Sequence, residues 1–441
     1  MPKLKSQSSR GGDALLPILM LLLVGTVAVG IVLEPVRPLA GLFLLLVALA
    51  GFSRLVRPQK VMISILSALG IGLAFVGMVR GYSPDVSEVL AVNQDIVAMI
   101  LSVSFVAIVA RPDSDSGYRL RGKPAVFRTA LVSHLLGSVI NLSAVTLVGD
   151  RLRGVQKMSL PNALLLSRTY SIGAFWSPFW AAAAAALTFA PGADVSVLIA
   201  GGFLLAMLAL VLGTFGVIRR LGDQVTEYQG YPLSPRVIFL PLVMVFLVVW
   251  AHWVWPEIKT TNLVLLCSLL ITVVLLALRS PRSMGATLFR HVRDVLPTMR
   301  GESSLFASAG VLAVGFSLFL STTQISLPSV DFGVVFAWVV VIIVVALSTL
   351  GIHQIISIGV IATLIAPLNP DPTLFAMACT AAWGCSAAIS PIGGLHLYIM
   401  GRFGVDSFTL SKSNILFVSG VVLLALPILS IVAYLQSVGW W

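Results

Sequence analysis

Two short stretches decide the fold: FWSPFWAAAAAAL at residues 175–187 and CSAAISPIGGLHL at residues 385–397. Each places a Ser-Pro pair inside an apolar segment, where proline removes a backbone donor that no water can replace. Serine is a favoured N-cap, and proline suits the first helical position. We therefore expect both pairs to interrupt a membrane helix and to start a second half-helix near mid-membrane.

The composition is typical of a polytopic membrane protein. Of 441 residues, 58% are hydrophobic and 10% are charged, and apolar runs long enough to cross a bilayer recur along the chain. The positive bias of cytoplasmic loops explains the net charge of +11, so no nucleic-acid partner is expected. The three cysteines lie in apolar segments without disulfide or metal-ligand spacing, which indicates packing residues.

Charge placement suggests a membrane topology. The expected spans are 15–33, 38–53, 61–79, 95–110, 160–190, 196–218, 236–255, 262–278, 303–321, 372–400 and 414–436. Basic loops flank the apolar segment 125–149, which indicates a re-entrant hairpin from the cytoplasm, and 333–367 is then a hairpin from the outside. This topology leaves three Lys or Arg residues outside, one within a span and 24 in cytoplasmic regions. The N-terminus is then cytoplasmic and the C-terminus periplasmic, in a bacterial inner membrane.

The two halves of the chain match at one constant offset, the spacing from Ser177 to Ser390, which we call the repeat offset. Under this offset Ser138 matches Gly351, Asn141 matches Gln354, and the two Ser-Pro pairs match each other. The fold class predicted is all-α, with about 11 transmembrane helices plus two re-entrant hairpins in an inverted repeat with broken helices. The expected regions are scaffold helices at 1–123 and 219–332, and the two halves of a transport domain at 124–218 and 333–441. The longest connections, 111–128 and 279–302, leave no room for a soluble domain.

Broken fifth and tenth helices, each following a hairpin, resemble the ion transporter superfamily. The topology is similar to that of its divalent anion/sodium symporters of dicarboxylates and citrate, and SPIGGLHLYIMGRFG at 390–404 is similar to the Pro-Gly break of several members. The tips GSVINLS (137–143) and GIHQIIS (351–357) lack the Ser-Asn-Thr pattern of the symporters. The resemblance implies an elevator mechanism and a homodimer formed through the scaffold helices.

Polar residues at the tips and breaks form the candidate site. The N–H groups and dipole of a half-helix suit an anion, and unwound carbonyls suit a cation. The candidate substrate-binding residues are Ser138, Asn141, Arg168, Ser177, Pro178, His353, Gln354, Ser390, Pro391 and Gly393. The candidate coupling-ion residues are Ser143, Ser357 and His396, of which the histidine titrates most readily near neutral pH. No cofactor is expected, and no metal is assigned.

Structural explanations compete with these assignments. A proline break can be a packing kink, polar tips can satisfy a turning backbone, and a membrane histidine commonly bonds between helices. Arg168 is the candidate counter-charge of a substrate anion, but its long side chain could instead snorkel to the cytoplasmic headgroups. Asp95 begins a span and is expected to stay solvated near the outer surface. Mid-membrane carboxylates are otherwise missing, which favours an anionic substrate.

These features predict a secondary active transporter of a small anion, by class an organic acid, with a sodium ion or a proton as coupling partner and the lipid bilayer as its surroundings. The sequence has no HExxH, GxSxG or GxxxxGK motif, so an enzyme is not expected. A membrane-embedded lipid- or glycan-processing enzyme, or an exporter of a neutral or cationic solute, remains the alternative. A channel fits broken-helix repeats less well than alternating access does.

Overall fold

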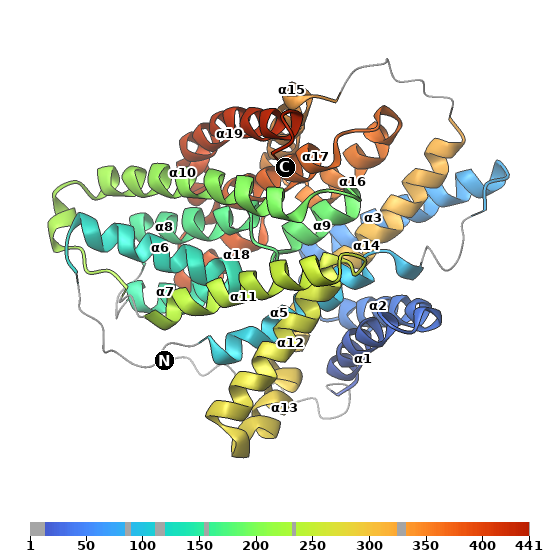
Figure 1. The fold of residues 1–441 in the computed structure, drawn as a ribbon, viewed down its shortest axis with the longest axis horizontal. Coiled ribbons are helices and arrows are strands. Elements are labelled where there is room, and N and C mark those ends of the chain that lie inside the picture. The colour runs from blue at the N-terminus through green and yellow to red at the C-terminus, as the bar shows by residue number, and fades with distance from the viewer. Residues whose placement is uncertain are drawn as a thin grey trace. The chain divides into compact units, whose positions relative to one another are not determined.

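The computed structural model describes residues 14–83, 90–110, 120–153, 158–231, 235–323 and 332–440. Helices are the regular elements of these residues, and one isolated β-bridge joins Arg121 to Gln229 (Figure 1). Seven helical stretches in the described chain are long and apolar enough to cross a membrane. The expected all-α membrane protein is therefore confirmed at this level. As expected, all three cysteines are buried and free.

The chain divides into two compact units. The first comprises Met1–Phe105 and Thr272–Gln324, and the second comprises Val106–Ile271 and Ile325–Trp441. The expected regions 124–218 and 333–441 both lie in the second unit, which also includes residues 219–271.

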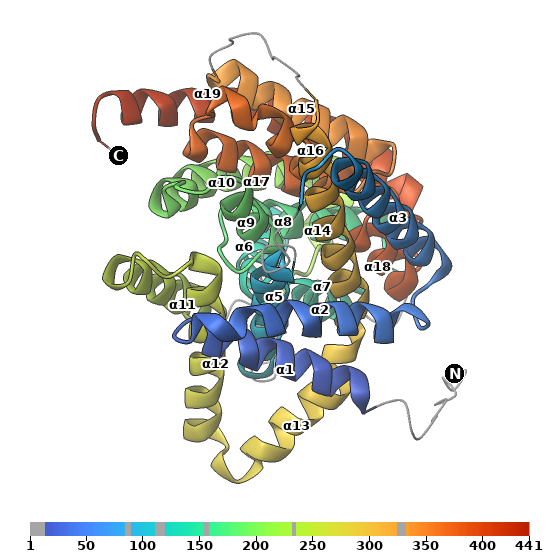
Figure 2. The same ribbon diagram turned by 90° about the vertical axis from the view of Figure 1, so that its right-hand side faces the viewer.

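The first unit is built on closely packed apolar helices. Its helices are α1 (Leu15–Gly30), α2 (Arg37–Phe52), α3 (Arg57–Val79), most of α5 (Gln94–Val109), the end of α12 (Thr260–Arg279), α13 (Met284–Asp294) and α14 (Arg300–Ser321). Figure 2 shows α1 and α2 side by side. Helices α3 and α14 cross at glycines, since a Cβ atom on Gly315 would collide with the Gly70 carbonyl oxygen. Small residues at such a crossing allow the two backbones to approach closely.

The expectation that Asp95 stays solvated is wrong. Asp95 is only 8% exposed, and Arg37 Nη2 donates to Asp95 Oδ2 at 3.1 Å. The position of Asp95 at the start of an apolar helix suggested a solvated carboxylate. In the structure Arg37, the first residue of α2 and 58 residues away in the sequence, pairs with this carboxylate. A buried carboxylate is tolerated where a cation pairs with it.

The second unit contains two series of helices. The first series is α6 (Lys123–Ile140), α7 (Leu142–Arg153), α8 (Leu160–Ser171), α9 (Ala181–Phe189) and α10 (Val195–Leu221). The second series is α15 (Val334–Thr349), α16 (Gln354–Ile365), α17 (Pro372–Ile389), α18 (Gly394–Phe403) and α19 (Ser407–Ser437). Helix α11 (Pro235–Val254) lies between them in the sequence and packs on α6 (Figure 1).

The helix bounds of the two series match at the repeat offset. Shifted by this offset, the first series would cover 336–353, 355–366, 373–384, 394–402 and 408–434, close to the observed bounds of the second. Aspartates cap the last helix of both series: Asp194 accepts from Ser196 N and Val197 N, and Asp406 accepts from Thr409 N. Both caps satisfy backbone donors that helix geometry leaves unpaired.

Candidate functional site

The first break separates α8 from α9. A short 3₁₀ turn, Ile172–Phe175, follows α8, and the next helix begins only at Ala181. Ser177 Oγ donates to the Ser138 carbonyl and accepts from Phe179 N at 3.2 Å. The expectation that the Ser-Pro pair starts the half-helix is wrong here, because the Ser177 side chain bonds within the break and to the preceding hairpin.

The second break separates α17 from α18. Ser390 is the C-cap of α17, and Gly393 is the N-cap of α18. Gly393 N donates to Ser390 O at 3.2 Å, so the segment 390–393 forms a turn that contains Pro391. The Ser-Pro pair again lies before the half-helix and does not cap it. The predicted interruption of both helices is nevertheless present, and the two N-caps, Trp180 and Gly393, are equivalent under the repeat offset.

The first hairpin tip is bonded to the first break. Asn141 joins α6 to α7 with a φ of 49° and a ψ of −136°, and asparagine occurs at positive φ more often than most residues. Its Nδ2 donates to Phe179 O at 3.2 Å, and Trp180 Nε1 donates to Gly137 O at 2.9 Å. The structure thus brings Asn141, Ser138 and Ser177 together, with Pro178 buried beside them. Ser143 is exposed, in the first turn of α7.

The second hairpin tip is more open. Gly351 has a φ of 93° and lies against the exposed side chain of Ile392 at the second break. A Cβ atom on this glycine would lie 2.8 Å from that side chain. His353 Nδ1 accepts from Ile355 N at 3.3 Å and caps α16. The side chains of Gln354 and Ser390 form no hydrogen bond with another described residue.

The two broken helices cross at matching positions. A Cβ atom on Gly384 of α17 would lie 2.7 Å from the carbonyl oxygen of Ser171 in α8, its equivalent under the repeat offset. Helices α10 and α19, which also match at this offset, pack against each other. Such contacts between equivalent elements are typical of a two-fold axis, because each surface there packs against the equivalent surface of the other half.

Each guanidinium nitrogen of Arg168 donates a hydrogen bond to a protein group. Its Nε donates to Asn414 Oδ1 at 2.9 Å, its Nη1 to Gly213 O at 3.2 Å, and its Nη2 to Ser413 O at 2.9 Å. The guanidinium also lies over the Phe417 ring, 5.2 Å from the centroid. The residue is 5% exposed, so in this conformation the side chain ties α8 to α10 and α19 and does not snorkel.

A chain of hydrogen bonds runs from Arg168 to His396. Asn414 Nδ2 donates to Ser167 Oγ at 3.0 Å and to Ala388 O at 2.7 Å. Ser167 Oγ lies 3.1 Å from His396 Nε2. The serine oxygen accepts from Asn414, and the hydroxyl can in addition either donate its proton to Nε2 or accept one from it.

His396 lies at the end of this chain, buried against the second break. The residue is 0% exposed, and its Nδ1 has no hydrogen-bond partner among the described residues. The ring lies beside the backbone of Ala388 and Ser390 at the second break. An ionisable side chain buried in a membrane helix beside a break in the backbone is a candidate for function.

The other buried histidine of this unit differs. His134 Nδ1 lies 3.2 Å from Thr169 O, and its Nε2 accepts from Trp176 Nε1 at 3.2 Å. Both ring nitrogens therefore have partners, as expected of a structural residue. Ser357 resembles His396 in part, because its buried Oγ lacks a partner in the described chain.

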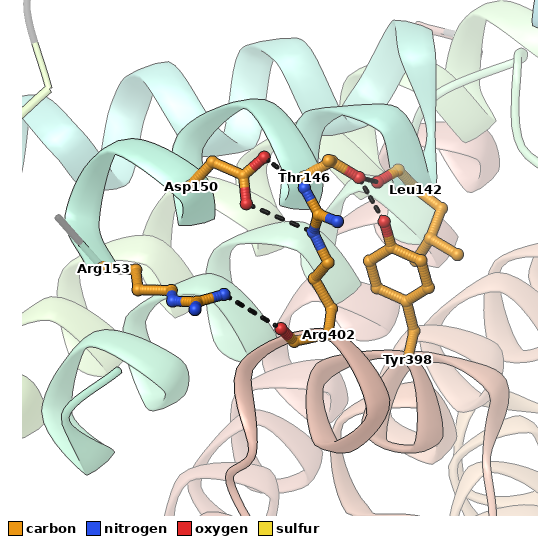
Figure 3. A network of polar contacts seen from close by, with 6 residues as sticks. All are labelled: Leu142, Thr146, Asp150, Arg153, Tyr398 and Arg402. Atoms are coloured by element: carbon orange, nitrogen blue, oxygen red, sulfur yellow. Dashed lines mark hydrogen bonds and ion pairs between the residues drawn. The ribbon is translucent and has the colours of Figure 1, made fainter. Parts of the chain in front are cut away.

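The far ends of α7 and α18 are joined by a polar network (Figure 3). Arg402 donates to both carboxylate oxygens of Asp150, at 3.2 and 2.7 Å. Arg153 Nη1 donates to Arg402 O at 3.4 Å, and Thr146 is hydrogen-bonded to Tyr398. These bonds tie the first hairpin to the half-helix of the second series.

Sequence reasoning missed Asn414 and Ser167, which connect the two broken helices. Asn414 stands within the long apolar helix α19, and an amide in such a helix usually bonds across to a neighbour. That signal was available from the sequence, whereas the partners of Asn414 depend on the tertiary structure. No group of three or more His, Cys, Asp or Glu suited to a metal occurs in the described ranges.

No protein-family model matches the chain, and no curated protein matches it.

Proposed function

We propose that this chain is a secondary active transporter of the elevator type, similar to the ion transporter superfamily, that moves a small anion with proton or sodium coupling. The observation that carries the proposal is the crossing of two broken helices at Ser171 and Gly384, which are equivalent positions of the two series. Broken helices related by an internal repeat are how many secondary transporters build a central binding site.

The proposed topology has eleven spans and two re-entrant hairpins, α6–α7 and α15–α16, that enter from opposite sides. Irregular backbone within a membrane is tolerated where protein buries it or where it lines a cavity. Residues 172–180 are buried in protein, whereas Ile392 at the second break is 52% exposed. We therefore assign substrate contact to the second break and its hairpin tip, with Gly393, Gln354 and His353 as the nearest candidates.

His396 is the proposed coupling group. Its ring lies buried against the backbone of Ser390 and Ala388 at the second break, and the hydrogen-bond chain from Arg168 holds its orientation. In this assignment Arg168 supports the coupling group through Asn414 and does not contact the anion in the present conformation.

Ligand-dependent thermal stabilisation of the purified protein tests the function. A ligand that binds only the folded state raises apparent stability as it saturates the site. Carboxylates, sulfonates and oxyanions are screened with and without sodium at two pH values. Stabilisation by one anion class, strengthened by sodium or by acid, is expected. Stabilisation by cationic, neutral or lipid-like compounds alone would favour the exporter or the membrane-embedded enzyme.

Cysteine labelling tests the inverted topology separately. Lys123→Cys, at the start of the first hairpin, is expected to react only from the cytoplasmic side, and Asn369→Cys, after the second hairpin, only from outside. The native cysteines are buried, which keeps the background low. Labelling of both positions from one side would contradict the inverted repeat.

A further inference from the structure

Helix α13 presents a basic and aromatic face in the first unit. The expected connection 279–302 contains this helix, which follows α12 in Figure 2. Its exposed residues include Phe289, at 65% exposure, together with Arg290 and Arg293. Arg293 lies over the Phe289 ring, 6.0 Å from the centroid. An aromatic side chain beside arginines on one helix face is typical of helices that lie in a membrane interface.

The opposite face of α13 is anchored to the rest of the unit. His291 is 7% exposed, its Nε2 lies 2.8 Å from Ser104 Oγ, and its ring is 4.4 Å from that of Phe105. Leu296, just after the helix, is fully buried. These contacts fix the orientation of α13, so its arginine face points away from the protein.

A second basic loop lies next to the same region. Arg300 Nη1 donates to Pro297 O at 2.9 Å, and its Nε donates to Arg54 O at 3.3 Å. Arg54 and Arg57 are both exposed. The structure therefore gathers basic residues from 53–60 and 279–302, which are far apart in the sequence.

Negative charge on this surface is low. Residues 279–302 contain five arginines against Asp294 and Glu302. Asp294 pairs with Arg293, at 2.8 and 3.1 Å, and Asp294 is the one acidic residue of α13. The helix face therefore keeps a net positive charge.

We propose that the Phe289, Arg290 and Arg293 face of α13 is a docking surface for anionic phospholipid headgroups. The phenyl ring would enter the acyl boundary. The Arg290 guanidinium and the donors of Arg293 that Asp294 does not occupy would bind lipid phosphates, for which arginine geometry is well suited. Clusters of basic residues next to a membrane span attract anionic lipids in this way. The proposal depends on the membrane setting of the helices and not on the transport function.

The test compares lipid binding by the full-length protein and two charge-matched variants. Phosphatidylglycerol is titrated into protein in phosphatidylcholine nanodiscs, and retained lipid and thermal stability are measured. Arg290→Gln with Arg293→Gln is the test variant. The control is Arg219→Gln with Arg220→Gln, which removes two exposed arginines from the end of α10.

The test variant should bind phosphatidylglycerol about thirtyfold more weakly, because each arginine near an anionic surface contributes about 1 kcal/mol. The control should bind as the unmodified protein does, and high salt should weaken binding to the unmodified protein. Phe289→Ala, which keeps all charges, should also weaken binding. Equal affinity for phosphatidylglycerol and phosphatidylcholine, or equal losses in the test and control variants, would overturn the proposal.

Discussion

At the first break the polar groups are bonded to a hairpin tip, whereas at the second break they are bonded to the long helix that follows. Ser177 and Trp180 bond to the backbone of α6. At the second break Asn414 bonds to Ala388 O, and Ser411 bonds to Ile389 O. The same chain path is therefore held by different partners in the two series.

The difference extends to packing against the last helix of each series. Gly202 of α10 approaches the carbonyl of Phe175 so closely that a Cβ atom on this glycine would collide with the oxygen. The equivalent of Phe175 under the repeat offset is Ala388, whose carbonyl accepts from Asn414 of α19. At the first break the Phe175 carbonyl therefore meets the backbone of a neighbouring helix. At the second break the equivalent carbonyl, that of Ala388, meets a polar side chain. Buried contacts hold the first break, while Ile392 at the second break is exposed. This arrangement is expected if the second break is the one that moves or contacts substrate.

The largest expected effect is at Asn414. Asn414→Ala removes partners from Arg168, Ser167 and Ala388, so the free energy of unfolding should fall by about 3 kcal/mol. Chemical unfolding in detergent measures it. Ser413→Ala is the matched control, because Arg168 bonds to the carbonyl of Ser413 and not to its side chain. Equal stability of both variants would show that the chain from Arg168 to His396 does not hold the second break.

The two serines of the Ser-Pro pairs give the next comparison. Ser177→Ala leaves the buried Ser138 carbonyl without its partner and should lower the free energy of unfolding by about 1–2 kcal/mol. Ser390→Ala removes no side-chain hydrogen bond to another described residue and should stay within about 0.5 kcal/mol of the unmodified protein. Thermal unfolding of both variants measures this. If the order of the two effects is reversed, the first break is not the more tightly held one.

A smaller effect is expected where the two series meet at their ends. Arg402→Gln breaks the pair with Asp150, whose side chains are 48% and 43% exposed. An exposed pair is screened by water, so the expected loss is about 0.5 kcal/mol. A double-mutant cycle with Asp150→Asn isolates the coupling. A coupling several times larger would mean that this exposed network, and not only the buried one, holds α18 against the first series.

The smallest effect concerns the Asp406 cap of α19. Hydrogen bonds from Thr409 N and Oγ1 hold the pKa of the Asp406 carboxyl below its usual range. The folded-state pKa is thus below the unfolded one, so the contribution to stability is present at neutral pH and is lost as pH falls through the folded pKa. The difference in melting temperature between the unmodified protein and Asp406→Asn should therefore shrink on acidification. A difference independent of pH would contradict this cap assignment.

Much of the helical framework could be predicted from the sequence, since long apolar segments and bounding Pro, Gly and charged residues are local signals. The match at the repeat offset was visible at a few polar positions, and the helix bounds agree with it across five elements. The exact start of each half-helix was not predictable. In the structure the Ser177 side chain bonds both to Phe179 N within the break and to the Ser138 carbonyl of α6, and the second bond depends on how the hairpin packs.

The sequence by itself determined that this is an apolar, helical chain with two interrupted helices and basic connections, because composition and proline chemistry act through the local chain. The tertiary structure decided which polar groups bond to other protein groups. Arg168 meets Asn414 across 246 residues, and Arg37 meets Asp95 across 58. Such pairings depend on how helices pack, so a charged residue in an apolar segment cannot be assigned to structure or to binding until its partners are known.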